Sequence, residues 1–294
     1  MPEDPRPLSH IMGINRRNLE LIFPHNPRHG FPVVDDKIRT KELLGSIGIA
    51  TPKTLRVVGN FLEIDRSIQA LKAASSFVVK PARGRAGGGV LLVKRDPLGQ
   101  WRSPSGKSVT DEQLRKHLAD ILFGVYSFGR MDDRALVEKR VEKHDFLQSI
   151  YENGIADIRL ILFQHRPVMA MLRIPTSTSD GKANLHQGAM GVQVDLDTGV
   201  TGDGFWRGKR LDTHPDTKVP IGGLTVPFWK EILEASPKAA AAVPLAYIGI
   251  DLVIDSNEGP LVLELNARPG LQIQVINHSG LAPRLFDETQ RKLP

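Results

Sequence analysis

Carboxylate side chains stand within two neighbouring apolar segments near the end of the chain. Asp251 lies in the segment Ile250–Asp255, Glu264 lies in the segment Pro260–Asn266, and Ser256–Gly259 between them is suited to a tight turn. The pattern predicts a β-hairpin. A turn centred on Asn257 and Glu258 gives three facing pairs, which are Asp251 with Glu264, Val253 with Val262, and Asp255 with Pro260.

Two carboxylates that face each other across a strand pair repel, unless a cation lies between them. Strand residues alternate between faces, so Asn266 shares a face with Glu264. Carboxylate and amide oxygens are ligands that Mg²⁺ prefers. Asp251, Glu264 and Asn266 are therefore a candidate metal site, and an ordinary hairpin whose acids point to solvent is the alternative.

A lysine followed by a cluster of glycines forms a second candidate. Lys80 follows the apolar run Phe77–Val79, and Gly84, Gly87, Gly88 and Gly89 precede the apolar segment Val90–Lys94. Glycine backbone N–H groups can approach an anion closely, and a lysine can neutralise a phosphate. The segment predicts a phosphate-binding loop between two strands, with a merely flexible hairpin as the alternative. The Walker and dinucleotide-binding spacings are absent.

Other signals are weaker when taken alone. Leu136–Val141 is suited to an edge strand whose backbone could bind adenine. Arg159, Arg173 and Arg268 lie in or beside expected strands, where a buried guanidinium needs an anionic partner and an exposed one does not. Asn184–Gly188 is a polar loop that contains His186, and a lone histidine is more often a surface residue than a catalyst.

The elements that position these residues form two mixed clusters. Periodicity predicts helices around Ile38–Ile47, Ile64–Leu71 and Thr110–Ile121, and strands around 54–58, 77–79, 90–94, 135–141, 158–163, 168–172 and 192–196. We interpret residues 1–34 as an arm and residues 201–238 as an irregular segment. Since strands and helices do not alternate regularly, the fold class is α+β.

Composition narrows the class of protein. The chain has 294 residues, 40% of them hydrophobic, no Cys and a net charge of +6, which excludes thiol catalysis, thiolate metal sites and a disulfide scaffold. Basic residues are spread among acidic ones and aromatic residues make up only 6%, so no nucleic-acid partner is expected. No run of apolar residues is long enough to span a membrane, and we expect a cytoplasmic protein.

Taken in order, the motifs resemble those of the ATP-grasp superfamily, most closely its alpha-L-glutamate ligase branch. The resemblance covers roughly residues 35–280. It rests on Asp36–Lys41, Val79–Pro81 with the glycine loop, Glu138–Val141, Asp157–Arg159, Asn184–Gly188, and Asp251 with Glu264, Asn266, Pro269 and Gly270. The hairpin motif is the most specific of these. Residues 202–244 are longer than in typical glutamate ligases and are similar to an ATP-grasp group associated with sugar transfer.

The resemblance implies an ATP-grasp fold in which two α+β subdomains grip ATP between them, with a short N-terminal arm in place of the usual N-terminal domain. The expected domains are the arm at 1–34, a first subdomain with the glycine-rich flap at 35–135, and a second subdomain with the metal-binding hairpin at 136–294.

Site roles also follow from the resemblance. Nucleotide-binding residues would be Lys37, Lys80, Gly87, Gly88, Glu138, Lys139, Val141 and, at the ribose, Asp145. Metal ligands for Mg²⁺ (or Mn²⁺) would be Asp251, Glu264 and Asn266. Catalytic cations would be Arg159, Arg173 and Arg268, and the substrate-binding residues would be Asn184 and His186.

The implied reaction is that of a carboxylate-amine ligase. ATP phosphorylates a carboxylate, and an amine then attacks the acyl phosphate to give an amide, ADP and phosphate. An amino acid such as glutamate would be added to a small peptide, a protein or a glycan-linked acceptor, and an oligomer is compatible with the sequence. The alternatives are an ATP-grasp phosphotransferase and a non-catalytic module that binds nucleotides or other anions.

Overall fold

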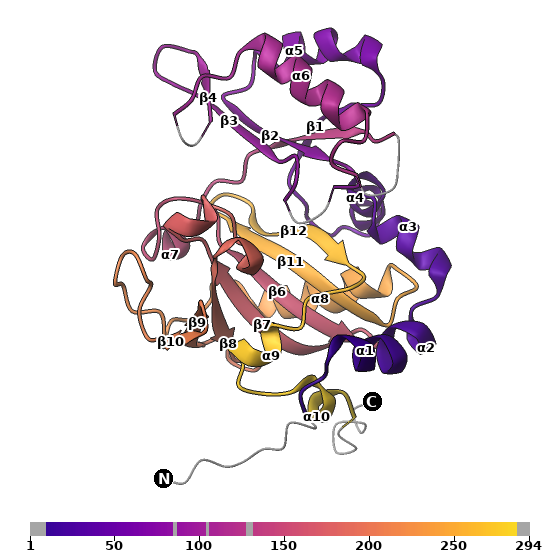
Figure 1. The fold of residues 1–294 in the computed structure, drawn as a ribbon, viewed down its shortest axis with the longest axis vertical. Coiled ribbons are helices and arrows are strands. Elements are labelled where there is room, and N and C mark those ends of the chain that lie inside the picture. Colours follow the sequence, from indigo (N-terminus) through magenta and orange to yellow (C-terminus); the bar gives the residue numbers. More distant parts are fainter. Residues whose placement is uncertain (1–9, 85–86, 104–105, 128–131, 287–294) are drawn as a thin grey trace. The chain divides into compact units, whose positions relative to one another are not determined.

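The computed structural model describes residues 10–84, 87–103, 106–127 and 132–286, which form two compact units (Figure 1). Unit 1 comprises Met1–Val34, Leu43–Ala50 and Lys143–Pro294, and unit 2 comprises Asp35–Glu42 and Thr51–Glu142. The division after Glu142 differs from the expected boundary after residue 135. The reason is strand β5 (Ala135–Lys139), which pairs with two strands of unit 2.

Unit 2 is built on a five-stranded antiparallel sheet in the order β1-β5-β2-β3-β4. Its other strands are β1 (Thr54–Val58), β2 (Ser76–Pro81), β3 (Leu91–Arg95) and β4 (Trp101–Arg102). Helices α5 (Ile64–Leu71) and α6 (Asp111–Leu122) share an apolar core with one face of the sheet. Thr110 begins α6 with a capping box to Gln113. Apart from the short β4, these elements match the sequence expectation.

The opposite face of this sheet carries Lys80, Leu136 and Glu138, because side chains alternate along a strand. Helix α4 (Lys37–Ser46) begins here, and its Ile38 packs with Ala82 and Leu136. Asp36 precedes the helix and its carboxylate accepts hydrogen bonds from the N–H groups of Ile38 (3.1 Å) and Arg39 (3.3 Å). This cap fixes the first turn of α4, which contains Lys37.

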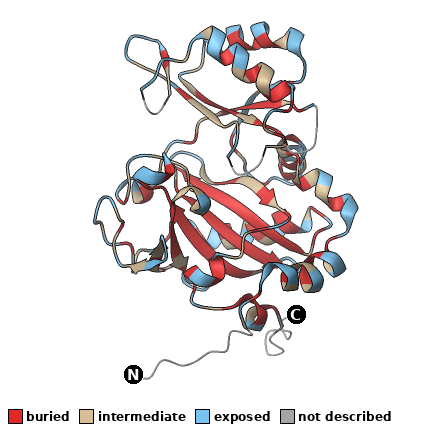
Figure 2. Cartoon of the chain, viewed as in Figure 1, coloured by how far each residue is buried: buried red, intermediate tan, exposed pale blue. Residues whose placement is uncertain are grey.

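Unit 1 contains a seven-stranded antiparallel sheet in the order β10-β9-β8-β7-β6-β11-β12. Its strands are β6 (Asp157–Phe163), β7 (Arg166–Ile174), β8 (Met190–Val194), β9 (Thr201–Trp206), β10 (Lys209–Leu211), β11 (Tyr247–Asp255) and β12 (Gly259–Asn266). Strands β6 and β11 are buried along their whole length (Figure 2). They are nearly continuous apolar runs because both faces of the sheet are covered.

The two faces of this sheet differ in what covers them. Helix α8 (Trp229–Ala241) packs against β6, β7 and β11 on the face that carries Leu160, Leu172 and Ile250. On the other face, helices α9 (Ile273–Ile276) and α10 (Leu281–Phe286) and the N-terminal arm cover Ile161, Met171 and Tyr247. Arg159, Arg173 and Asp251 lie on that second face as well.

The expectation that residues 201–238 are irregular was wrong, because this segment contains β9, β10 and most of α8. Two glycines hide the alternation of β9. A Cβ atom at Gly204 would lie 2.1 Å from the Cε atom of Met190 and 2.6 Å from the Cδ1 atom of Ile221, so the packing requires glycine there. Gly202 is similarly crowded by Gln193. Strand geometry therefore arises here from pairing with β8 and not from the apolar pattern.

The arm also contains more structure than its sequence indicated. It includes α1 (Ile14–Arg17), a π-helical turn at Asn18–Ile22, α2 (Phe23–His25) and α3 (Phe31–Val34). Their buried residues pack on unit 1. Among the residues that the structure describes, no helix has the length and apolar character needed to cross a membrane.

The hairpin register decides which side chains meet. The expected pairing of Asp251 with Glu264 is confirmed. A bulge after Asp251 shifts the rest, so that Val253 pairs with Leu261 and Asp255 with Gly259, and the two other expected pairs were wrong.

We expect Ile250→Ala to destabilise unit 1 by about 2–5 kcal/mol, because the wholly buried side chain leaves a cavity in a packed core. Chemical denaturation checks this. Leu19→Ala, at a position 65% exposed, is the control and should change the free energy of unfolding by less than about 0.5 kcal/mol. Equal losses in the two variants would contradict the described packing.

Candidate functional site

Two lysines contact one buried carboxylate in unit 2. Glu138 is 2% exposed, and its Oε2 atom lies 2.5 Å from the Nζ atom of Lys80, while Oε1 accepts a hydrogen bond from the Nζ atom of Lys41. Lys41 also donates to the backbone oxygen of Pro52. The three charged groups together carry one net positive charge.

These contacts keep Glu138 ionised. Burial by itself would raise the pKa of Glu138, but the positive charges of Lys80 and Lys41 outweigh it and lower the pKa. Burial lowers the pKa of Lys41, and Glu138 opposes that effect. Lys41 was missed by the sequence reasoning. Its spacing of four residues from Lys37, on one helix face, is the signal that could have found it.

The expected adenine segment lies at the end of β5, which pairs with β1 on one side and β2 on the other, so the expected edge strand was wrong. Lys139 donates its backbone N–H to the backbone oxygen of Lys53 at 2.8 Å, so that group is engaged within unit 2. Val141 is buried, two residues beyond. The Glu138 side chain points to the two lysines, on the sheet face opposite the helices α5 and α6.

The glycine loop is anchored where it begins. Arg83 pairs with Asp36 through its Nε atom at 3.2 Å and donates its backbone N–H to Asp133. Lys37 donates to the backbone oxygen of Gly84 at 2.8 Å. Asp36 is 2% exposed and also pairs with Arg134, and these contacts lower its pKa in spite of burial. One carboxylate thus fixes both the first turn of α4 and the base of the loop.

The loop is also held where it ends. His117 contacts the backbone oxygen of Gly89 through its Nε2 atom at 2.9 Å, and burial lowers the pKa of His117. A Cβ atom at Gly89, which has a φ of +72°, would lie 2.6 Å from the Tyr126 ring. Gly87 has a φ of +74° with open space around it. Gly88 follows it, while residues 85–86 of the expected flap lie outside the described residues.

Unit 1 holds a buried group of two acids and two arginines on neighbouring strands. Arg159 donates from Nε to Asp251 at 2.6 Å and also pairs through Nη2. Arg173 donates to Asp251 at 2.9 Å and to Asp157 at 2.5 and 2.6 Å. Each residue is at most 8% exposed. Their charges sum to zero, which lets four ionic groups share an interior position.

The two acids differ in strength. Burial would raise the pKa of Asp251, but Arg159 and Arg173 outweigh it and lower the pKa well below its usual range. Burial raises the pKa of Asp157 to about 6 against the pull of Arg173, and the nearby Asp251 adds to the rise. Asp251 is therefore the carboxylate that stays ionised, and both arginines are directed at it.

A metal is the cation expected between the facing carboxylates, whereas in the structure two arginines, Arg159 and Arg173, contact Asp251. Glu264 lies opposite Asp251 and is half-buried. Asn266 accepts the N–H of Arg268 at 3.0 Å through its Oδ1 atom, which keeps a second lone pair. The oxygen donor set fits Mg²⁺. Within the described part of the chain no three His, Cys, Asp or Glu side chains form a metal-binding group, so any metal shell would need Asn266 and substrate oxygens.

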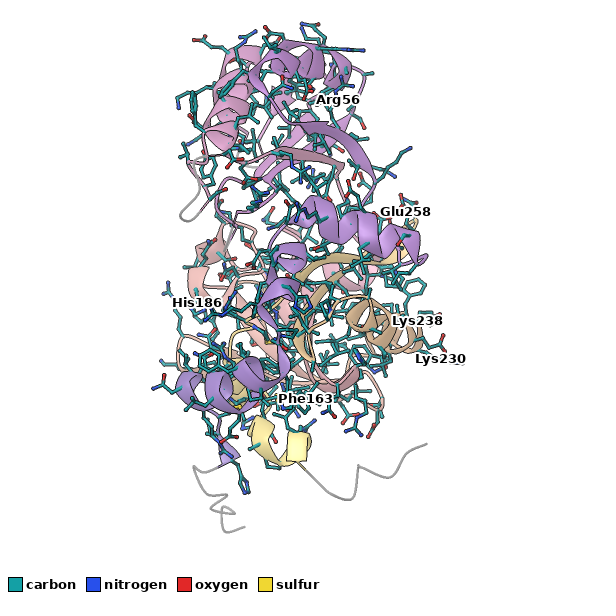
Figure 3. All side chains as sticks on the ribbon, turned by 90° about the vertical axis from the view of Figure 1, so that its right-hand side faces the viewer. Arg56, Phe163, His186, Lys230, Lys238 and Glu258 are labelled. Carbon is teal, nitrogen blue, oxygen red and sulfur yellow. The ribbon has the colours of Figure 1, made fainter. Side chains whose placement is uncertain are left out.

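The remaining expected residues lie elsewhere on unit 1. The guanidinium of Arg268 stacks over Phe31 of α3, 4.2 Å from the ring centroid. Asn184 caps a short 3₁₀ turn by accepting the N–H of His186, which is exposed and labelled in Figure 3. Asp145 is the exposed first residue of α7 (Asp145–Gln148). The structure thus gathers Arg159, Arg173, Asp251 and Glu264, and it places Asn184, His186 and Asp145 outside that group.

We expect Asp251→Asn to cost about 3–5 kcal/mol of unfolding free energy, because it leaves two buried arginines short of an anion. Glu264→Gln should cost less than about 1 kcal/mol, since losing one of two facing charges relieves repulsion. Urea denaturation of both isosteric variants checks the pair. A larger loss for Glu264→Gln than for Asp251→Asn would contradict the described charge arrangement.

A probable alpha-L-glutamate ligase of Xanthomonas oryzae pv. oryzae is 27% identical over 258 residues, which are 87% of this chain, and the chain spans 65% of that protein's length. A probable alpha-L-glutamate ligase of Mannheimia succiniciproducens is 26% identical over 270 residues, with 92% of this chain and 67% of that protein covered.

Among solved structures, D-cycloserine synthetase DcsG superposes with a TM-score of 0.51 at 16% identity, covering 90% of this chain and 72% of that one. That likeness confirms the expected fold, an α+β structure with two antiparallel sheets. The sequence profile of the sugar-transfer-associated ATP-grasp family matches residues 16–290. The chain belongs to the sugar-transfer-associated ATP-grasp family.

Proposed function

We propose that this protein is an ATP- and Mg²⁺-dependent carboxylate-amine ligase that forms ADP. The observation that carries the proposal is the buried group of Asp251, Arg159 and Arg173 beside Glu264. It combines ionised oxygens with fixed cations on one rigid sheet face. Such an arrangement suits the transfer of a phosphoryl group, in which catalysis is mostly positioning and charge stabilisation.

In this proposal unit 2 binds the nucleotide. Lys37 and Lys80 contact phosphates, and the loop at Gly87 and Gly88 covers them. The backbone of Lys139 and Val141 holds adenine beside Glu138, and the resemblance of the motifs assigns the ribose to Asp145. The net positive charge of the Lys41–Glu138–Lys80 group supports this assignment.

Unit 1 would bind the metal and the acid. Asp251, Glu264 and Asn266 would hold Mg²⁺ (or Mn²⁺), which when bound offsets charge on the phosphate oxygens. Arg159, Arg173 and Arg268 would stabilise the charge that develops as the carboxylate oxygen attacks the γ-phosphorus of ATP and ADP leaves. The amine nitrogen then attacks the carbonyl carbon of the acyl phosphate, phosphate leaves, and the amine loses a proton. No nucleophilic side chain is required.

The names of the similar proteins suggest the acid. Probable alpha-L-glutamate ligases at 27% and 26% identity support an amino acid such as glutamate as a substrate. The acceptor in the proposal is a peptide, protein or glycan-linked amine near Asn184 and His186, and the His186 side chain is exposed on unit 1.

The first test is incubation with ATP, Mg²⁺ and hydroxylamine against amino acids, short peptides and other carboxylates. Hydroxylamine traps an acyl phosphate as a hydroxamate without the natural amine. We expect hydroxamate and ADP with one class of acid. ADP formed without hydroxamate would favour a phosphotransferase, and the absence of both products would favour a binding module.

The lysine pair gives a separate prediction. In Lys41→Met, Lys80 is the single lysine left to neutralise Glu138. The positive charge of Lys80 is then no longer available to a phosphate. Lys80→Met removes the phosphate contact itself. Both variants should weaken ATP binding at least tenfold, measured by calorimetry, and leave adenosine binding nearly unchanged. Lys94→Met, at an exposed position on β3, is the charge-matched control. Equal losses for ATP and adenosine would indicate a structural role only.

A further inference from the structure

The N-terminal arm places a buried arginine against the loop that follows β12. Arg17, at the end of α1, is 8% exposed, and its Nη1 atom donates to the backbone oxygen of Pro269 at 3.1 Å. Its Nε and Nη2 atoms donate to the side-chain oxygen of Asn18 at 3.2 and 2.8 Å. Figure 1 shows α1 beside the sheet of unit 1.

All of these acceptors are neutral. In the part of the chain that the structure describes, no carboxylate pairs with Arg17. A buried guanidinium without an anion is costly, which is why Arg159 and Arg173 have acidic partners and why the lack of one at Arg17 needs a reason. Burial lowers the pKa of Arg17, and the positive charge of nearby Arg268 lowers it further against the effect of Tyr247.

The hydroxyl of Tyr247 is a second buried polar group that lacks a partner within the described residues. Its side chain is fully buried, and its hydroxyl has no hydrogen-bond partner among the described residues. It lies on β11, on the same sheet face as Asp251. Asn26 of the arm fixes its backbone by accepting its N–H at 2.9 Å and donating to its oxygen at 2.7 Å. Burial raises the pKa of Tyr247, so the hydroxyl stays a neutral donor.

The position of Arg268 completes the group. Pro269 packs so closely over Gly249 that a Cβ atom there would lie 2.8 Å from the Cβ of Pro269. Phe31 of the arm stacks on the Arg268 guanidinium, which is exposed. The arm therefore contacts Arg268 and Pro269 from two sides, through Phe31 and Arg17.

We propose that Arg17, Arg268 and the Tyr247 hydroxyl form a subsite that binds a carboxylate group of the substrate. A carboxylate has only acceptor atoms, and it can take N–H bonds from a guanidinium and an O–H bond from a phenol together. Among the described residues Arg17 has no anionic partner and the Tyr247 hydroxyl has no acceptor, and a bound carboxylate would supply both. The assignment of this carboxylate to the ligase substrate rests on the proposed function.

The test measures melting temperature and calorimetric affinity without ATP or Mg²⁺, using L-glutamate, succinate and inorganic phosphate as probes. Wild-type protein should be stabilised by at least one carboxylate. Arg17→Gln should abolish that rise, while Arg16→Gln should retain it, because Arg16 is 39% exposed and pairs with Glu20 at the surface. The subsite would be overturned if neither carboxylate raised the melting temperature of the wild-type protein. It would also be overturned if Arg17→Gln and Arg16→Gln changed that rise equally. A response to phosphate alone would overturn its assignment to a carboxylate.

Tyr247→Phe keeps the test decisive if Arg17→Gln does not fold. Removing a buried hydroxyl that has no partner within the described ranges should leave the melting temperature of the free protein unchanged or raise it. The same change should weaken carboxylate binding at least threefold. A loss of stability together with unchanged affinity would show a structural hydroxyl and overturn the proposal.

Failure of the ligase and failure of the subsite are distinguishable. Carboxylate binding that depends on Arg17, without hydroxamate formation, would contradict the proposed function alone. Hydroxamate formation whose KM for the acid is the same in Arg17→Gln and Arg16→Gln would contradict the subsite alone.

Discussion

The cost of burying charge governs unit 1. Asp251 lies within the buried strand β11, in a sheet that is apolar on its other face, so its carboxylate can be ionised only if cations reach it from neighbouring strands. Antiparallel pairing supplies them, because β6 places Arg159 opposite Asp251 and β7 places Arg173 one strand further away. The same pairing brings Asp157 opposite Arg173. The strand register thus produces a neutral ionic group and fixes the direction of each side chain before any ligand binds.

Unit 2 buries a carboxylate in the same way, but its ionic group keeps an excess of positive charge. Glu138 is as buried as Asp251, but two lysines contact it, and one positive charge remains. That excess is suited to an anion such as a polyphosphate. Asp36 links the two phosphate-binding candidates of this unit, since it caps the helix that begins at Lys37 and pairs with Arg83 at the base of the glycine loop. Lys37 and Gly84 are therefore held in register with each other.

Much of the fold follows from sequence patterns because buried strands and amphipathic helices have strong periodicity. The hairpin illustrates both the reach and the limit of that reasoning. Turn residues and apolar runs correctly predict that Asp251 faces Glu264. The pattern does not predict the bulge that follows Asp251, and this bulge shifts the pairing of Val253. Strand β9 shows another limit, since its glycines serve neighbours such as Met190 that only the folded chain brings near. The role of Lys41 was not predicted, because that role depends on its contact with Glu138, which is distant in the sequence.

The structure of the arm was the hardest to predict from the sequence, and there is a physical reason for this. Its contacts with the site use Phe31 on a cation, Arg17 on a backbone oxygen and Asn26 on a strand end, and none of these produces a periodic pattern. Each nevertheless acts on β11 or on the loop after β12, the segments that carry Tyr247 and Arg268. A short segment without a core of its own is ordered by such contacts only where unit 1 supplies their partners. The order of the arm and the geometry around Arg268 are consequently one property of unit 1, because each provides the surface on which the other is fixed.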